Sequence, residues 1–146
     1  MKKIIIFSLI VFSTFSCSVD DGVGIENSFH KEILPIENVN MPSIFTTGNT
    51  YSIQYAYLRR TNCHSFDDLY LVRENNTITI AVIDLVTDQT LNGGACETLE
   101  EQYVSQSFDF FVNTDSGTLY TFKFWQGVNE ENGEDLYLVV DVPVIQ

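Results

Sequence analysis

Basic residues are scarce in this chain, and their scarcity excludes whole classes of partner. The 146 residues include 7 Lys and Arg against 20 Asp and Glu, a formal net charge of −13 at pH 7. Nucleic acids and anionic lipid headgroups are bound through clustered Lys and Arg, so a surface of this sign repels them. We therefore expect no nucleic-acid partner, and we expect the carboxylates to serve mainly in keeping the protein soluble.

Histidine is almost absent, which restricts the chemistry that the chain can support. With only two histidines, His30 and His64, any Ser-His-Asp or Cys-His arrangement must use one of them. His64 lies in the richest polar stretch, Cys63-His64-Ser65-Phe66-Asp67-Asp68, but no second histidine or Cys-x-x-Cys pair accompanies it at zinc-ligand spacing. We predict no catalytic residue, no metal and no cofactor. A small hydrolase centred on His64 is the enzymatic alternative.

Oxygen ligands are plentiful in one place only, the polar stretch 129–135. Its Asn, Asp and Glu side chains are of the type that Ca²⁺ prefers, but their order does not match an EF-hand loop. Polar hairpin tips are common, so this stretch is expected to be a solvated turn.

Long apolar runs are missing as well. The run Ile4–Phe15 is too short to span a bilayer as a helix, which needs roughly twenty residues. Because Lys2 and Lys3 precede it and the small Ser16 follows it, the run predicts a secretory signal peptide over residues 1–16.

The residues around the expected cleavage point carry a resemblance. Thr14-Phe15-Ser16-Cys17 resembles the lipobox of bacterial lipoproteins, and Asp20-Asp21 resembles the acidic surface-export signal of lipoproteins in the Bacteroidota. The resemblance implies a lipid on Cys17, a tether over residues 17–29, and a place on the outer membrane, facing the medium. A plain signal peptide with an incidental cysteine is the alternative.

Cysteine is rare, and export decides how the remaining two cysteines are expected to behave. Cys63 and Cys96 would meet an oxidising compartment, so we predict a disulfide between them. Two buried thiols or half of a metal site are the alternatives.

Helical periodicity is lacking throughout residues 30–146, where apolar and polar residues alternate instead. We expect a single all-β domain of about seven short antiparallel strands. The expected strands cover 30–39, 50–59, 66–73, 77–86, 103–112, 119–126 and 136–144. Pro35 marks the first as an edge strand. Strands of this length with turn signals between them are typical of a β-sandwich.

Two turns predict the register of two hairpins. A two-residue turn at Asn75-Asn76 sets Leu71 opposite Ile80. A three-residue loop, Glu131-Asn132-Gly133, sets Phe124 opposite Val140 and Lys123 opposite Asp141.

The approach to the 119–126 strand carries a second resemblance. Asp115-Ser116-Gly117-Thr118-Leu119-Tyr120 is similar to the segment before the penultimate strand of immunoglobulin-like domains, which implies an immunoglobulin-like β-sandwich. Alternatively, Asp115-Ser116-Gly117 closes a hairpin that pairs Phe110 with Phe122, which favours a meander or small barrel.

One aromatic patch is expected on the surface. Because Phe122 and Phe124 alternate into the core, Trp125 and Lys123 should point outward, near Tyr137. An outward Trp beside a Tyr suits a protein partner or a sugar ring. We therefore expect a lipid-anchored, non-catalytic binding or accessory module at the cell surface. A protease inhibitor or a structural component of an outer-membrane assembly is the alternative.

Overall fold

The computed structural model describes residues 29–90 and 93–146, and these residues form nine strands and no helix. The strands are β1 (Phe29–Leu34), β2 (Ile36–Asn40), β3 (Phe45–Thr46), β4 (Thr50–Leu58), β5 (His64–Glu74), β6 (Thr77–Thr87), β7 (Tyr103–Phe111), β8 (Leu119–Val128) and β9 (Asp135–Ile145). The predicted all-β class is confirmed, with nine strands in place of about seven.

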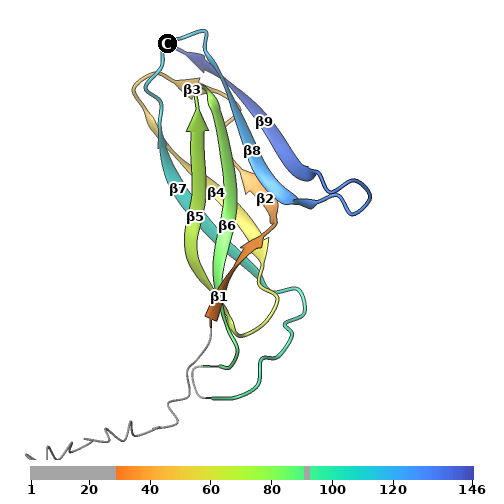
Figure 1. Ribbon diagram of the computed structural model, residues 1–146. Coiled ribbons are helices and arrows are strands. Elements are labelled where there is room, and N and C mark those ends of the chain that lie inside the picture. The colour runs from red at the N-terminus through yellow and green to blue at the C-terminus, as the bar shows by residue number, and fades with distance from the viewer. Residues whose placement is uncertain (1–28, 91–92) are drawn as a thin grey trace, which may run out of the picture.

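The strands form two sheets, as in a β-sandwich (Figure 1). The order of strands in the larger sheet is β5-β6-β8-β9-β3, and β1 pairs with β6 beyond the point where the pairing of β6 with β8 ends. The order in the smaller sheet is β2-β4-β7. Two pairs, β3 with β9 and β6 with β8, are parallel, whereas we expected antiparallel pairs only.

The core lies between the sheets and follows the predicted alternation. Ile53, Tyr55 and Tyr57 of β4 are buried against Phe122 and Phe124 of β8 in one apolar cluster. The odd residues of β4 and the even residues of β8 supply these side chains because successive side chains of a strand point to opposite faces. The outer face of β8 carries Trp125, which is half-buried.

Pro35 divides the first predicted strand into two. β1 pairs with β6 in the larger sheet, whereas β2 pairs with β4 in the smaller one. The predicted interruption at Pro35 and the edge position of β2 are confirmed, but the two halves are separate strands in different sheets. Proline lacks the N–H that a continuous ladder needs, and the chain changes sheets where the ladder is interrupted.

The hairpin at Asn75-Asn76 has the predicted register, with Leu71 opposite Ile80 and Glu74 opposite Thr77. Asn75 has a φ of 56°, the left-handed conformation that asparagine tolerates.

The register predicted for the last hairpin is wrong by two residues. Phe124 faces Leu138 rather than Val140, and Asp141 faces Thr121 rather than Lys123. The loop closed by the Asn129 N–H to Glu134 carbonyl hydrogen bond is one residue longer than predicted and shifts the register by one residue. The bulge between Trp125 and Gly127, where Gly127 has a φ of 115°, shifts it by one more. A shift of two residues preserves the faces, so the inward set was still correct on β8.

The meander alternative is also wrong. β7 pairs with β4, and β8 pairs with β6 and β9, so Phe110 and Phe122 belong to different sheets. Their rings meet across the core, with centroids 5.1 Å apart.

Candidate functional site

The three residues of the predicted patch lie together on the outer face of the larger sheet. Trp125 of β8 and Tyr137 of β9 are directly opposite each other. The Lys123 Nζ atom lies 4.2 Å from the centroid of the Tyr137 ring, within the range of a cation–π contact.

Asp135, at the start of β9, fixes this arrangement. The indole Nε1–H of Trp125 donates to Asp135 Oδ1 at 2.9 Å, and the Tyr137 hydroxyl donates to Asp135 Oδ2 at 3.4 Å. Partial burial, and next the charge of Asp135, raise the pKa of Tyr137, so its hydroxyl stays protonated and remains a donor near neutral pH. The Trp125 ring is therefore held in one orientation.

The sheet order extends the patch into a row. The parallel ladder of β6 with β8 ends at Ile80 and Phe124, the residues that precede Ala81 and Trp125. On the far side, Tyr70 of β5 pairs with Ala81 and is 47% exposed. Tyr70 and Ala81 form one cross-strand pair and Trp125 and Tyr137 another, and we call these four residues the aromatic row.

Tyr70 was missed by the sequence reasoning. The Asn75-Asn76 register does place Tyr70 on the outer face, which is the one signal that pointed to it. Its proximity to Trp125 depends on the parallel pairing of β6 with β8, for which no local turn gives a signal.

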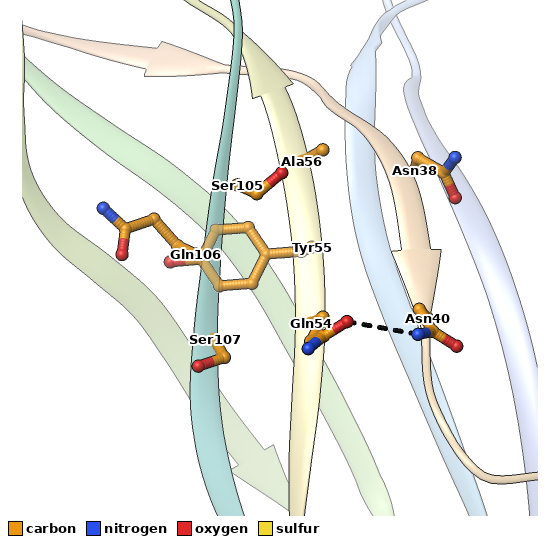
Figure 2. Close-up of a pocket in the computed structure, with 8 residues that line it drawn as sticks. All are labelled: Asn38, Asn40, Gln54, Tyr55, Ala56, Ser105, Gln106 and Ser107. Atoms are coloured by element: carbon orange, nitrogen blue, oxygen red, sulfur yellow. Dashed lines mark hydrogen bonds between the residues drawn. The ribbon is translucent and has the colours of Figure 1, made fainter.

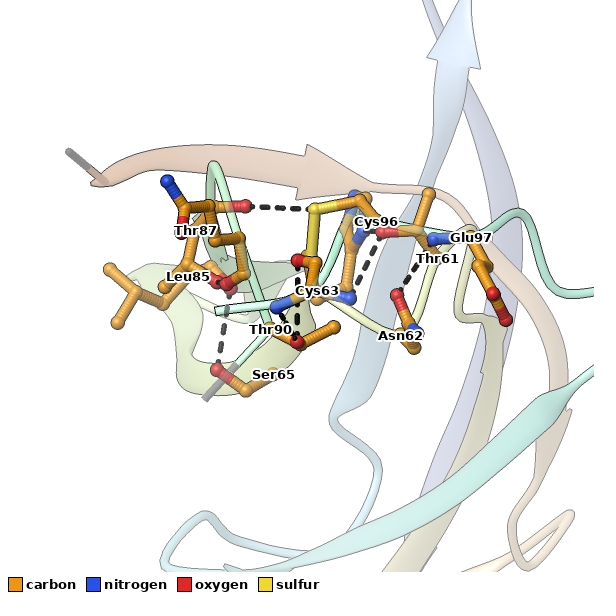
Figure 3. Close-up of a disulfide and its surroundings, with 12 residues drawn as sticks. Thr61, Asn62, Cys63, Ser65, Leu85, Thr87, Thr90, Cys96 and Glu97 are labelled. Carbon is orange, nitrogen blue, oxygen red and sulfur yellow. Dashed lines mark hydrogen bonds between the residues drawn. A yellow bond between two sulfur atoms is a disulfide. The ribbon is translucent and has the colours of Figure 1, made fainter. Parts of the chain in front are cut away.

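The predicted disulfide between Cys63 and Cys96 is present, with Cα atoms 5.5 Å apart and 33 positions of separation (Figure 3). The disulfide ties the start of β5 to the segment between β6 and β7. An isolated β-bridge between Thr61 and Thr98 joins the same two parts of the chain. The Asn62 side chain accepts the backbone N–H of Glu97 at 2.9 Å. This end of the sandwich is closed by covalent and polar links.

His64 is buried next to the disulfide, 6% exposed, and both ring nitrogens are engaged. Nδ1 lies 2.7 Å from Thr61 Oγ1, and Nε2 lies 2.9 Å from Glu32 Oε2. Glu32 also pairs with Arg60. The Ser65 hydroxyl donates instead to the Leu85 carbonyl oxygen, so it is not directed at His64. His64 therefore links β1 to β5.

Asp84 is the most unusual side chain of the interior. It is fully buried on β6, opposite Glu32 of β1, and neither carboxylate oxygen has a hydrogen-bond partner among the described residues. Burial raises the pKa of Asp84, while the nearby His64, the Tyr57 hydroxyl and Arg59 act in the opposite direction. Burial first, and then the nearby Asp84, raise the pKa of Tyr55 to about 12 and also raise the pKa of Tyr57.

A shallow hollow of about 420 Å³ lies over the smaller sheet (Figure 2). Its side chains are uncharged, and Asn40 donates to Gln54 Oε1 at 3.1 Å. The hollow is lined by Asn38, Asn40, Gln54, Tyr55, Ala56, Ser105, Gln106 and Ser107. None of the aromatic row belongs to it.

The remaining predicted sites have these positions. Cys17 lies outside the described residues. In the polar tip, Asn129 Oδ1 and Asn132 Oδ1 accept backbone N–H groups of the turn itself.

Within residues 29–90 and 93–146, no group of three or more His, Cys, Asp or Glu side chains is placed to hold a metal ion. A search of the same residues finds no helix with the length and apolar character to cross a membrane.

Comparison with known proteins gives no relative: no protein-family model, no curated protein and no solved structure matches the chain.

Proposed function

We propose that this chain is a non-catalytic binding module that is anchored to the surface of a bacterial outer membrane by a lipid on Cys17 and binds a glycan on the aromatic row. The observation that carries the proposal is the half-buried Trp125 ring, whose Nε1–H donates to Asp135 on the outer face of the sheet. A ring that is already oriented loses little conformational freedom when a ligand stacks on it.

The chemistry of the aromatic row favours a sugar. The C–H face of a pyranose stacks on aromatic rings, and its hydroxyls donate to carboxylates such as Asp135. The net charge of −13 opposes acidic ligands, so a neutral polysaccharide is the class proposed.

The test is affinity electrophoresis of the full-length protein in gels that contain soluble neutral polysaccharides. We expect retardation of the wild-type protein by at least one of them, and loss of at least tenfold in affinity for Trp125→Ala and Tyr137→Ala. Val139→Ala is the matched control, because Val139 is 53% exposed on the same strand as Tyr137 and lies outside the row. Equal retardation of the wild-type protein and Trp125→Ala would refute the proposal.

A second function is favoured by the disulfide-tied loops. Exposed residues around Cys96 are fixed to the start of β5 by the Cys63–Cys96 bond, the arrangement of a rigid loop offered to another protein. A protease inhibitor, or a structural component of an outer-membrane assembly, would use this end. Inhibition of a protease that disappears on reduction would favour it over glycan binding.

The immunoglobulin-like assignment is part of the proposal. In its support, the strands β2, β4 and β7 of the smaller sheet correspond to the first, second and fifth of the seven strands expected from the sequence. The first, second and fifth strands are also adjacent in the first sheet of immunoglobulin-like domains. The position of β6 between β5 and β8 departs from that fold, in which the strand equivalent to β5 is adjacent to the penultimate strand.

A further inference from the structure

β7 is an edge strand of the smaller sheet. It pairs with β4 over nine consecutive residues, from Tyr103 to Phe111, without a register shift. Within the described part of the chain, no strand pairs with its other side (Figure 2). A strand in this position presents a row of backbone groups that a further strand can pair with.

The alternation of the ladder identifies these groups. Arg59 N–H donates to the Gln102 carbonyl at 3.0 Å, and Val112 N–H donates to the Asn49 carbonyl at 2.9 Å. Backbone groups of antiparallel strands alternate between the two sides, so the even-numbered residues of β7 face β4. The N–H and C=O groups of the odd residues, including Ser105, Ser107 and Asp109, are directed to the free side.

The β7 edge lacks the features that usually prevent an edge strand from pairing with another chain. β7 carries one charged residue, Asp109, and contains no Lys, Pro or bulge. The β5 edge of the larger sheet is different, because β5 has a bulge between Phe66 and Asp68 and carries four charged residues, two of them at the bulge. Of these two edges, β7 is the uninterrupted one.

The sequence of β7 matches itself in the antiparallel direction. With Ser107 opposite Ser107 of a second copy, all pairs are of compatible chemistry, and Asp109 does not face its own equivalent. The pairs are Tyr103 with Phe111, Val104 with Phe110, Ser105 with Asp109, and Gln106 with Phe108. Aromatic and apolar cross-strand pairs stabilise a sheet, and like charges directly opposite destabilise it.

Neighbouring registers are less favourable. A shift of two residues sets Tyr103 opposite Asp109 in one direction and Ser105 opposite Phe111 in the other, and both lose the Tyr103–Phe111 pair. Val104 and Phe108 are only partly buried at this margin and pack on the core, so the apolar side chains of an added copy would lie beside them.

We propose that β7 is the docking edge for a second copy of this chain, which pairs with it antiparallel about a two-fold axis at Ser107. The two smaller sheets then become one continuous sheet, and the interface is the same patch on both copies. The interface is independent of the aromatic row, because Trp125 belongs to the other sheet.

The test is cysteine cross-linking in the full-length protein, in membranes of a host that processes lipoproteins. Ser107→Cys places two thiols on a hydrogen-bonded antiparallel pair, with Cα atoms about 5.5 Å apart, within disulfide range. Ser105→Cys is the matched control, since Ser105 is equally exposed on the same face but its two copies lie about 14 Å apart at roughly 3.4 Å per residue. Ser105→Cys/Asp109→Cys restores a facing pair.

On oxidation we expect a linked dimer for Ser107→Cys and for the double variant, at least fivefold above that for Ser105→Cys. Equal linkage at 105 and 107 would overturn the proposed register. Absence of linkage in both Ser107→Cys and the double variant would overturn the docking edge itself.

Discussion

Asp84 shows what one buried carboxyl group does to the stability of a small sandwich. The even residues of β6 face the core, so the alternation directs Asp84 inward together with Ile80 and Val82. Asp84 is fully buried without a hydrogen-bond partner because side chains from β1 and β4 cover it. These strands are distant in sequence, so no local pattern could reveal this burial.

We predict that Asp84→Asn stabilises the protein near neutral pH. Because burial raises the folded-state pKa of Asp84 above that of the unfolded chain, stability is retained at acid pH and lost as the pH rises through the folded-state pKa. Asparagine does not titrate, so we expect a gain of about 1–2 kcal/mol at pH 7, the scale of an unsatisfied buried group.

The gain from Asp84→Asn should vanish below the ordinary value of 3.8, where both side chains are neutral. Urea unfolding of the wild-type protein and the variant at acid and neutral pH measures the difference. A variant that is as stable as the wild-type protein at acid pH but less stable at neutral pH would show that the ionised carboxylate is stabilised in the fold.

At the scale of the strand, alternation predicted which residues face the core, and turn chemistry predicted one of two hairpin registers. The two-residue turn at Asn75-Asn76 leaves no freedom in pairing, so the prediction was correct. The longer loop before Glu134 and the bulge at Gly127 together displaced the register of β8 and β9 by two residues without changing the faces, which is why Lys123, Trp125 and Tyr137 still lie together. The pairings of β6 with β8 and of β7 with β4 could not be predicted, because they join strands distant in sequence.

We predict that removing the disulfide lowers stability without affecting the aromatic row. In the chain-entropy account, a loop spanning 33 positions contributes about 3–4 kcal/mol, so Cys63→Ala/Cys96→Ala should lose that amount in urea unfolding. Polysaccharide binding by the folded variant should be unchanged, because Trp125 and Tyr137 are on β8 and β9. Loss of binding under conditions where the variant is folded would place the disulfide end in the ligand site and favour the second function.

At the scale of the whole molecule, the alternation of apolar and polar residues predicted the all-β class and the spacing of turns predicted a β-sandwich, whereas the sheet order came only from the structure. Two parallel pairings, β3 with β9 and β6 with β8, join strands that are far apart in sequence. No adjacent turn specifies such pairs, and the pairing of β6 with β8 brings the two halves of the aromatic row into one sheet.

We predict that the mature chain begins at an acylated Cys17. Mass spectrometry of the protein from membranes should find residues 1–16 absent and lipid on Cys17, because a thiol at the new N-terminus accepts the diacylglyceryl group. Cys17→Ser removes the thiol that accepts the lipid, so the protein should leave the membrane fraction or keep its leader uncut. The acyl chains are what hold such a protein to the membrane. A native chain that retains residues 1–16 would contradict the anchor.

β1 is the first described strand after Cys17, and it runs beside β6 through six consecutive pairs from Phe29 to Leu34 (Figure 1). If a cell is held by this protein in flowing liquid, tension enters at Phe29 and is directed along the strand. The six pairs then resist sliding together, in shear, instead of opening one after another. The same strand order that builds the sandwich would make it a mechanically tough link between a cell and the material it grips.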